Sequence, residues 1–141
     1  MVLDTNTIHD WRRRITVFIV DDSAIVRSAL LTLLSSLPDV ELVGEASSGQ
    51  AALESIRRLK PDVVILDIHM AEGPNGIHIL EHIKKEDSPP VIIMLTNYSF
   101  EQYRRRCLDA GADFFFDKST EFEKVPDVLR ALSQDPGKRG H

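Results

Sequence analysis

Several features that define other classes of protein are scarce in this sequence. It contains one cysteine, Cys107, which excludes an intramolecular disulfide and a cysteine-rich metal site. Its 17 lysines and arginines stand against 22 aspartates and glutamates, so it lacks the basic surface that nucleic-acid or anionic-membrane binding requires. No apolar run approaches the roughly 18 residues of a membrane span, and the longest, Ile15–Val20, is too short for most signal peptides. We therefore expect a cytoplasmic protein that binds neither nucleic acid nor membrane.

The length and composition indicate a single folded domain. A chain of 141 residues has room for one domain and hardly for two. Its hydrophobic fraction of 43% and charged fraction of 28% lie near the globular average, which argues against disorder, collagen-like repeats and coiled coils. We predict a folded domain over residues 15–134, with a polar N-terminal tail over residues 1–14 and a polar C-terminal tail over residues 135–141.

Two apolar patterns alternate along the chain. Five short runs rich in β-branched residues lack polar alternation, which is typical of parallel strands buried on both faces. These runs are Ile15–Val20, Val40–Val43, Val63–Leu66, Val91–Leu95 and Ala112–Phe116. After each of them, apolar residues recur at spacings of three and four, which predicts an amphipathic helix. Five strand–helix pairs predict an α/β fold of the (βα)5 type, a doubly wound five-stranded parallel sheet with helices on both faces.

Capping residues support this order of elements. Ser47 and Ser99 each begin a Ser-x-x-Gln sequence, the spacing of a capping box in which side chains satisfy the first free N–H groups of a helix. Gly111 lies where a left-handed C-cap would end the fourth helix. We expect the fifth helix to begin near Val125, because Pro126 is tolerated only in a first turn.

Polar side chains follow four of the predicted strands. In an open parallel sheet, ligands bind beyond the carboxyl ends of the strands. Three carboxylates, one hydroxyl and one ammonium group stand at these ends: Asp21 and Asp22, Asp67, Thr96, and Lys118. We therefore expect these five side chains to converge at one edge of the sheet.

The chemistry of this set favours phosphoryl transfer to a carboxylate. Three clustered carboxylates repel one another, and a divalent cation relieves the repulsion. Mg²⁺ suits such a site because it prefers one or two carboxylates, retained waters and phosphate oxygens. A carboxylate beside Mg²⁺ can attack phosphorus and form an aspartyl phosphate, while Mg²⁺ and Lys118 neutralise charge. Thr96 could donate a hydrogen bond to a phosphoryl oxygen.

Each of these residues also has a simpler interpretation. Residues 21–23 could be an N-cap, with negative charge at the positive end of a helix dipole. A lone aspartate after a strand is usually a turn residue. Thr96 could be another cap, Lys118 a solvated surface charge and His69 an ordinary loop histidine. The combination at four separate strand ends favours a functional site.

In this order and spacing, the motifs resemble the receiver domain of two-component response regulators. The resemblance runs from about Ile15 to Leu132. Its motifs are Val17-Phe-Ile-Val-Asp21-Asp22-Ser, Val63-Val-Ile-Leu-Asp67-Ile-His-Met70, Met94-Leu-Thr96 and Gly111-Ala-Asp-Phe-Phe-Phe-Asp-Lys118-Ser119. The similarity extends to stand-alone receivers of the chemotaxis-regulator kind and implies a flavodoxin-like fold with strand order 2-1-3-4-5.

The resemblance also implies a role for each residue of the site. Asp67 would accept a phosphoryl group from a histidine kinase or a histidine phosphotransfer protein. Asp22, Asp67 and the main-chain carbonyl of His69 would bind Mg²⁺, with Asp21 acting through a bound water. Lys118 would pair with the phosphoryl group.

A second set of implied roles concerns signalling. Thr96 would move toward the phosphoryl group and let Phe115 turn inward, a two-state change biased by new charge. His69 and Tyr98 occupy positions that tune the lifetime of the phosphate. The altered surface would comprise the fourth helix, fifth strand and fifth helix, through which a homodimer could also form.

Several residues depart from the family's pattern. The loop before Gly76 is one residue longer and has Ala71 where proline is usual. Asn97 replaces a small residue. Ser119 replaces a proline that follows the lysine in a cis peptide bond, a geometry that costs about 3–4 kcal/mol without proline. Phe115 lacks the hydroxyl of the tyrosine often found at the switch.

Three functions are compatible with the sequence. The first is a stand-alone phosphorylation switch, not an enzyme in the usual sense, that acts through a protein partner. The second is an aspartate-nucleophile phosphohydrolase, although such enzymes have Asp-x-Asp after the first strand and here Asp21 and Asp22 are adjacent. The third is a degenerate receiver that binds without phosphorylation. The presence of all five polar groups favours the first.

Overall fold

The computed structural model describes residues 14–134, so the two predicted tails, apart from Arg14, lie outside the described residues. Strands and helices alternate throughout this part of the chain. In order they are β1 (Ile15–Val20), α2 (Ala24–Ser35), β2 (Val40–Ala46), α3 (Gly49–Leu59), β3 (Val63–Leu66), α4 (Gly76–Ile83), β4 (Val91–Thr96), α5 (Glu101–Asp109), β5 (Phe114–Asp117) and α6 (Lys124–Gln134).

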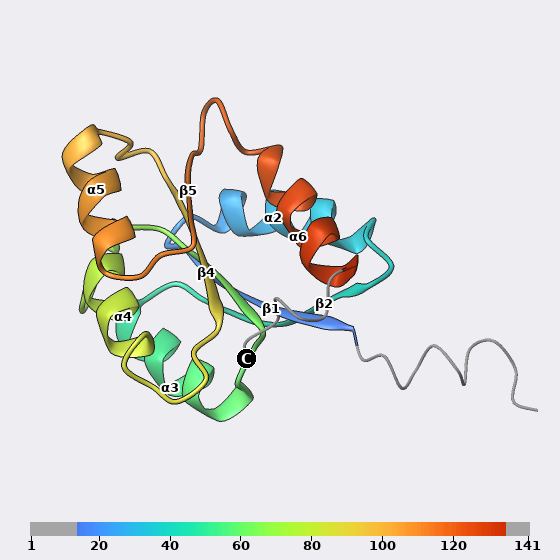
Figure 1. Ribbon diagram of the computed structural model, residues 1–141, viewed down its shortest axis with the longest axis horizontal. Helices are drawn as coiled ribbons and strands as arrows, with labels where there is room; N and C mark the ends of the chain where they lie inside the picture. The colour runs from blue at the N-terminus through green and yellow to red at the C-terminus, as the bar shows by residue number, and fades with distance from the viewer. Residues whose placement is uncertain (1–13, 135–141) are drawn as a thin grey trace, which may run out of the picture.

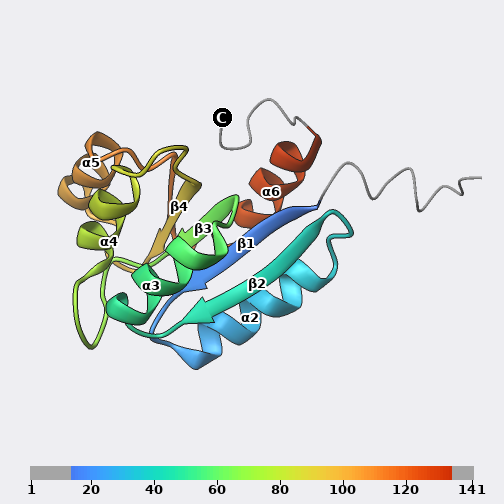
Figure 2. The ribbon, with the colours of Figure 1, turned by 90° about the horizontal axis from the view of Figure 1, so that it is seen from below.

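The strands form one parallel sheet in the order β2-β1-β3-β4-β5, which confirms the predicted topology. Helices α2 and α6 cover one face of the sheet, and α3, α4 and α5 cover the other (Figures 1 and 2). Every residue of β3 is buried, because this strand has neighbours on both sides and helices on both faces. The continuous apolar runs in the sequence follow from this double burial.

The hydrophobic core has two layers, one on each side of the sheet. Side chains alternate along β1, so that Phe18 and Val20 pack on the face of α3, α4 and α5. Ile15, Val17 and Ile19 pack on the opposite face with residues of α2 and α6. The two layers fix the central strands, and the polar residues that follow them are held by this rigid base.

Both predicted capping boxes are wrong. Helix α3 begins at Gly49, and its N-cap is Ser48, whose hydroxyl accepts a hydrogen bond from the Ala51 N–H at 3.4 Å. A side chain at position 49 would place its Cβ 2.2 Å from the carbonyl oxygen of Pro74, so tertiary contact fixes where this helix starts. The N-cap of α5 is Phe100, without a side-chain hydrogen bond, so Ser99 does not cap this helix.

The ends of three strands also differ from the prediction. Strand β4 extends by one residue to Thr96, which pairs with Asp117 of β5. Strand β2 continues past Val43 to Ala46, with an irregularity in its register against β1. Strand β5 begins at Phe114, because Ala112 still belongs to the C-terminal cap of α5 and donates to the Cys107 carbonyl at 3.0 Å. Gly111 has φ +108°, which confirms the predicted left-handed cap.

Candidate functional site

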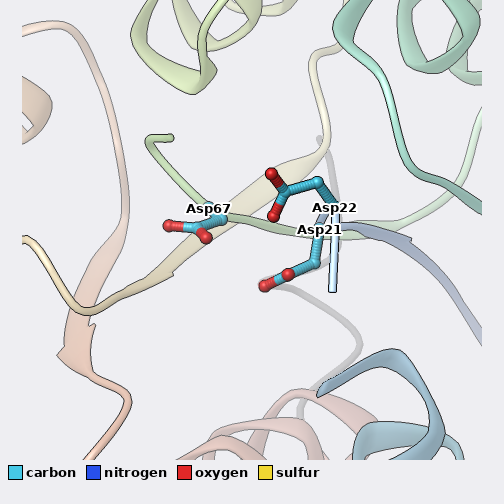
Figure 3. A group of neighbouring side chains, drawn as sticks. All are labelled: Asp21, Asp22 and Asp67. Atoms are coloured by element: carbon cyan, nitrogen blue, oxygen red, sulfur yellow. The ribbon is translucent and has the colours of Figure 1, made fainter. Parts of the chain in front are cut away.

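Three carboxylates meet at the carboxyl edge of the sheet. Asp21 and Asp22 follow β1, and Asp67 follows β3, the strand next to it. Residues Val20 and Leu66 are register partners, so the strands end at the same level. One carboxylate oxygen from each aspartate lies within 4.8 Å of the others (Figure 3). The structure therefore brings together the three predicted metal-binding side chains.

Lys118 joins the cluster from β5 at the far side of β4. Its Nζ lies 2.6 Å from Oδ2 of Asp21 and 2.8 Å from Oδ2 of Asp67. The lysine side chain is 10% exposed, and those of the two aspartates are 3% and 8% exposed. Lys118 is thus a buried counter-ion for two carboxylates rather than a solvated surface charge.

The site holds more negative than positive charge. Burial raises the pKa of Asp21 despite its hydrogen bonds to Lys118 and to the Ser23 N–H. Burial alone would lower the pKa of Lys118, but its hydrogen bonds to Asp21 and Asp67 outweigh this and raise it. Among the described residues, one ammonium group faces three carboxylates, so a cation is needed for balance.

One buried oxygen of the cluster has no partner among the described residues. Oδ1 of Asp67 is buried and receives no hydrogen bond, whereas Oδ2 is held by Lys118. An orphaned buried carboxylate oxygen is costly in a folded protein. The observation fits a divalent cation, because Mg²⁺ takes carboxylate oxygen ligands and would neutralise part of the charge.

The turn after β1 combines a helix cap with the acidic site. Ser23 is the N-cap of α2 and accepts a hydrogen bond from the Val26 N–H at 3.2 Å. Oδ1 of Asp21 accepts from the Ser23 N–H at 2.9 Å, and its Oδ2 contacts Lys118. The capping interpretation therefore holds for Ser23, while the carboxylates of Asp21 and Asp22 face the cluster.

Thr96 is fully buried at the end of β4. Its Oγ1 accepts a hydrogen bond from the Tyr98 N–H at 3.1 Å, and its carbonyl accepts one from the Lys118 N–H at 3.0 Å. The threonine hydroxyl thus holds the turn after β4, while its backbone fixes the residue that carries the counter-ion.

The loop from Asp67 to α4 is anchored despite its extra length. Asn75 caps α4, accepting hydrogen bonds from the N–H groups of Ile77 and His78. The backbone at Gly76 passes so close to Asp67 that a Cβ there would lie 1.8 Å from the Asp67 carbonyl oxygen. Glycine at position 76 therefore allows the helix start to pack directly against the candidate phosphoacceptor.

The loop after β5 is held by Asp117. Its Oδ1 accepts hydrogen bonds from the Ser119 N–H at 2.7 Å and the Ser119 hydroxyl at 2.5 Å. Hydrogen bonds from the Ser119 and Ser99 hydroxyls and the Ser119 N–H lower the pKa of Asp117 to about 2. Residues 14–134 contain no cis peptide bond, so the Lys118–Ser119 peptide is trans, unlike the geometry implied by the family.

The proposed tuning and switch residues lie around this edge. The rings of His69 and Tyr98 have centroids 5.6 Å apart, so the two predicted rate-tuning residues meet. Phe115 is buried, with the Arg104 guanidinium 5.9 Å from its ring centroid. The phenylalanine ring already points inward here.

Arg27 and Glu45 border the site, and sequence reasoning assigned neither a role. Arg27 donates to the Asp21 carbonyl at 2.7 Å and to Glu45 Oε1 at 2.7 Å. A signal was present, because Arg27 is the one charged residue in the twelve of α2. A lone charge in an otherwise uncharged surface helix points to a specific contact.

Comparison with known proteins identifies the family. Residues 17–130 match the model of the response regulator receiver domain. The chain therefore belongs to the receiver domains of response regulators in two-component signalling, a family that typically binds Mg²⁺. No helix within residues 14–134 is long and apolar enough to cross a membrane.

Individual relatives agree with this assignment. The chain is 35% identical over 120 residues to the response regulator protein VraR of Staphylococcus aureus strain Mu3, an alignment that covers 85% of this chain and 57% of that protein. The chain therefore spans little more than half of that relative.

Solved structures agree as well. The response regulator domain of Thermotoga maritima CheB has a TM-score of 0.75 at 36% identity, covering 86% of this chain and 95% of that one. A chain of the CheX–CheY–BeF3–Mg²⁺ complex of Borrelia burgdorferi has a TM-score of 0.77 at 29% identity, covering 89% and 92%.

Proposed function

We propose that this receiver works as a phosphorylation switch in which Asp67 accepts the phosphoryl group. The orphaned Oδ1 of Asp67 carries the proposal. This oxygen is buried next to two further carboxylates, while Lys118 holds the other oxygen of the same group. A carboxylate with one oxygen restrained and one unpartnered is prepared to gain either a metal bond or a covalent bond.

Asp22, Asp67 and the main-chain carbonyl of His69 would hold Mg²⁺, with Asp21 acting through a bound water. The ion would neutralise charge on the cluster and on the oxygens of the incoming phosphoryl group. Lys118 contributes the second positive charge, because its Nζ already contacts Asp67 and can turn toward a phosphoryl oxygen. Thr96 supplies a buried hydroxyl for another of these oxygens.

The transfer itself needs little from the protein beyond positioning. An oxygen of Asp67 forms a bond to phosphorus as the bond from phosphorus to the donor breaks. The donor is the phosphorylated imidazole of a histidine kinase or of a histidine phosphotransfer protein. The imidazole nitrogen leaves with the bonding pair, and a proton taken up from water on the ring restores the neutral histidine side chain. The product is an acyl phosphate on Asp67, with additional negative charge at the edge of the sheet.

The consequence of phosphorylation is a change in the protein-binding surface formed by α5, β5 and α6. Movement of Thr96 toward the phosphoryl group breaks its hydrogen bond from the Tyr98 N–H and releases the turn before α5. Because Phe115 is already buried, this turn carries more of the change than the phenylalanine ring. The same surface is our candidate for homodimer formation.

The neighbouring rings of His69 and Tyr98 set how readily water reaches the phosphoryl group. In this account the protein catalyses its own phosphorylation and dephosphorylation and turns over no separate substrate. A stand-alone mode of action, a cytoplasmic location and the absence of nucleic-acid binding stay predictions. The RcsB response regulator of Salmonella typhimurium, whose structure shows conformational dynamism for DNA interaction, is 26% identical to this chain, which covers 62% of that longer chain.

Phosphorylation by acetyl phosphate tests the proposal. Purified protein is incubated with and without Mg²⁺, and its intact mass is read at once beside the variants Asp67→Asn and Asp87→Asn. Asp87 is an exposed aspartate outside the cluster and serves as the matched control. We expect one phosphoryl adduct that requires Mg²⁺ and Asp67 and persists in D87N. No adduct, together with no binding of beryllofluoride, would indicate a receiver that acts by binding alone.

A further inference from the structure

Arg27 lies behind the acidic cluster and touches its backbone rather than its carboxylates. Its side chain is 18% exposed, although α2 is a surface helix. One nitrogen of its guanidinium group donates to the Asp21 carbonyl oxygen at 2.7 Å. A charge-assisted hydrogen bond of this length is among the stronger ones in proteins.

This contact restrains the peptide group between Asp21 and Asp22. The peptide is planar, so a fixed carbonyl at Asp21 also fixes the N–H and the Cα of the next residue. From that Cα, the Asp22 carboxylate reaches toward Asp67. Unlike Asp21, Asp22 has no hydrogen bond or ion pair among the described residues that holds its carboxylate, so its position depends on its backbone.

Glu45 in turn restrains Arg27. Its Oε1 accepts a hydrogen bond from Nε of Arg27 at 2.7 Å, and Glu45 lies opposite Ile19 in the register of β2 and β1. The next residue, Ala46, accepts a hydrogen bond from the Asp21 N–H at 3.1 Å. The planar guanidinium fork therefore joins the ends of β1 and β2 at the level of the acidic turn.

We infer that Arg27, held by Glu45, is a positioning residue for Mg²⁺ binding, acting through the Asp21–Asp22 peptide. The inference rests on the proposed function of the acidic cluster and adds two residues that do not touch the ion. The charge of Arg27 and its proposed positioning role predict opposite effects of its removal on Mg²⁺ affinity. Removing a positive charge beside a cation site would strengthen Mg²⁺ binding, whereas releasing the metal-binding turn would weaken it.

The experiment is a Mg²⁺ titration of ¹⁵N-labelled protein, following the amide resonances of residues 21–23 and 67–69. The variants are Arg27→Ala, Arg27→Lys and Glu45→Gln. The control is Arg57→Ala, because Arg57 is paired with Glu86 at 3.8 Å on the surface of α3. A thermal melt of each variant without metal shows whether it is folded.

We expect R27A to bind Mg²⁺ about tenfold more weakly, the lower end of the usual effect of removing an outer-shell partner. R27K should also bind Mg²⁺ at least about threefold more weakly. Its ammonium group keeps the positive charge but cannot reproduce the planar guanidinium group that bonds to both the Asp21 carbonyl and Glu45. The Mg²⁺ affinity of E45Q should lie between those of R27A and the unmodified protein, and R57A should bind Mg²⁺ as tightly as the unmodified protein.

Each other outcome has a defined meaning. Unchanged or tighter binding in folded R27A would overturn the inference and leave the metal site in place. If R27A does not fold, normal binding in R27K would overturn it, and weakened binding in R27K would support it. Failure of the unmodified protein to bind Mg²⁺ would overturn the proposed metal site and this inference together.

Discussion

Replacing Lys118 by methionine removes the counter-ion of two buried carboxylates while nearly preserving side-chain volume. Nζ lies 2.6 Å from Asp21 and 2.8 Å from Asp67, and all three side chains are at most 10% exposed. Removing one partner of a buried ion pair typically costs about 3–5 kcal/mol, because it leaves the other charge uncompensated. We therefore expect K118M to be markedly less stable than the unmodified protein in the absence of metal.

Protonation of one carboxylate sets an upper limit to this cost. Protonating an aspartate costs about 1.4 kcal/mol for each pH unit above its ordinary pKa, which amounts to about 4 kcal/mol at pH 7. At pH 5 the same limit is about 1.5 kcal/mol. In the variant, the folded-state pKa of one carboxyl is raised above its unfolded value. The folded state then binds more protons, and the variant's stability rises relative to the unmodified protein as pH falls.

Urea unfolding of K118M and of the unmodified protein, with a chelator present, measures the loss of stability at pH 7 and at pH 5. The account predicts a loss of about 3–4 kcal/mol at pH 7 that shrinks to about 1.5 kcal/mol or less at pH 5. A loss below about 1 kcal/mol at pH 7, or an equal loss at both pH values, would refute the reasoning that Lys118 neutralises buried charge.

Three further predictions concern the surroundings of the site. Gly76→Ala should lose about 3 kcal/mol in urea unfolding and take up little phosphate from acetyl phosphate, because its Cβ would lie 1.8 Å from the Asp67 carbonyl oxygen. A gain in stability would instead show that helix propensity outweighs the clash. Burial raises the pKa of Cys107 to about 11, so its thiol should not react with a disulfide reagent at pH 8 until the protein unfolds; rapid reaction of the folded protein would contradict its burial. Asp22→Asn should unfold at slightly higher urea without metal, by up to about 1 kcal/mol, but gain no stability from Mg²⁺; stabilisation by Mg²⁺ equal to that of the unmodified protein would contradict its role as a ligand.

The topology and the acidic cluster could be predicted because both follow from local patterns. Strands buried on both faces leave continuous apolar runs, as in Val63–Leu66, and parallel strands bring their carboxyl ends to one edge. Asp67 follows such a run directly, and Asp22 and Lys118 each stand two residues after the end of one. A correct strand order was therefore enough to predict that these side chains meet at one edge of the sheet.

The starts of α3 and α5 could not be predicted, because long-range contacts decide them. Ser99 has the spacing of a capping residue, but the N-cap of α5 is Phe100, and Ser99 instead helps to lower the pKa of Asp117 at the end of β5. The start of α3 is set by Gly49 against the Pro74 carbonyl, from a loop 25 residues later in the chain. A pattern of four residues contains no information about partners so far away in sequence.

Two details of the site also depend on tertiary structure. Phe115 was expected to turn inward only on phosphorylation, yet its ring is buried with the Arg104 guanidinium over it. The contact of Arg27 with the Asp21 carbonyl requires α2 to cross the end of β1 at a particular angle. Neither arrangement follows from residue spacing.

The central claim is that Asp67, and no other carboxylate, takes the phosphoryl group. Its most direct test treats the protein with acetyl phosphate and Mg²⁺, reduces the acyl phosphate with borohydride, and locates the resulting alcohol by peptide mass spectrometry. The account predicts reduction at position 67 alone, and none when Mg²⁺ is left out. Reduction at Asp21, Asp22 or a surface carboxylate, or equal labelling without Mg²⁺, would contradict it.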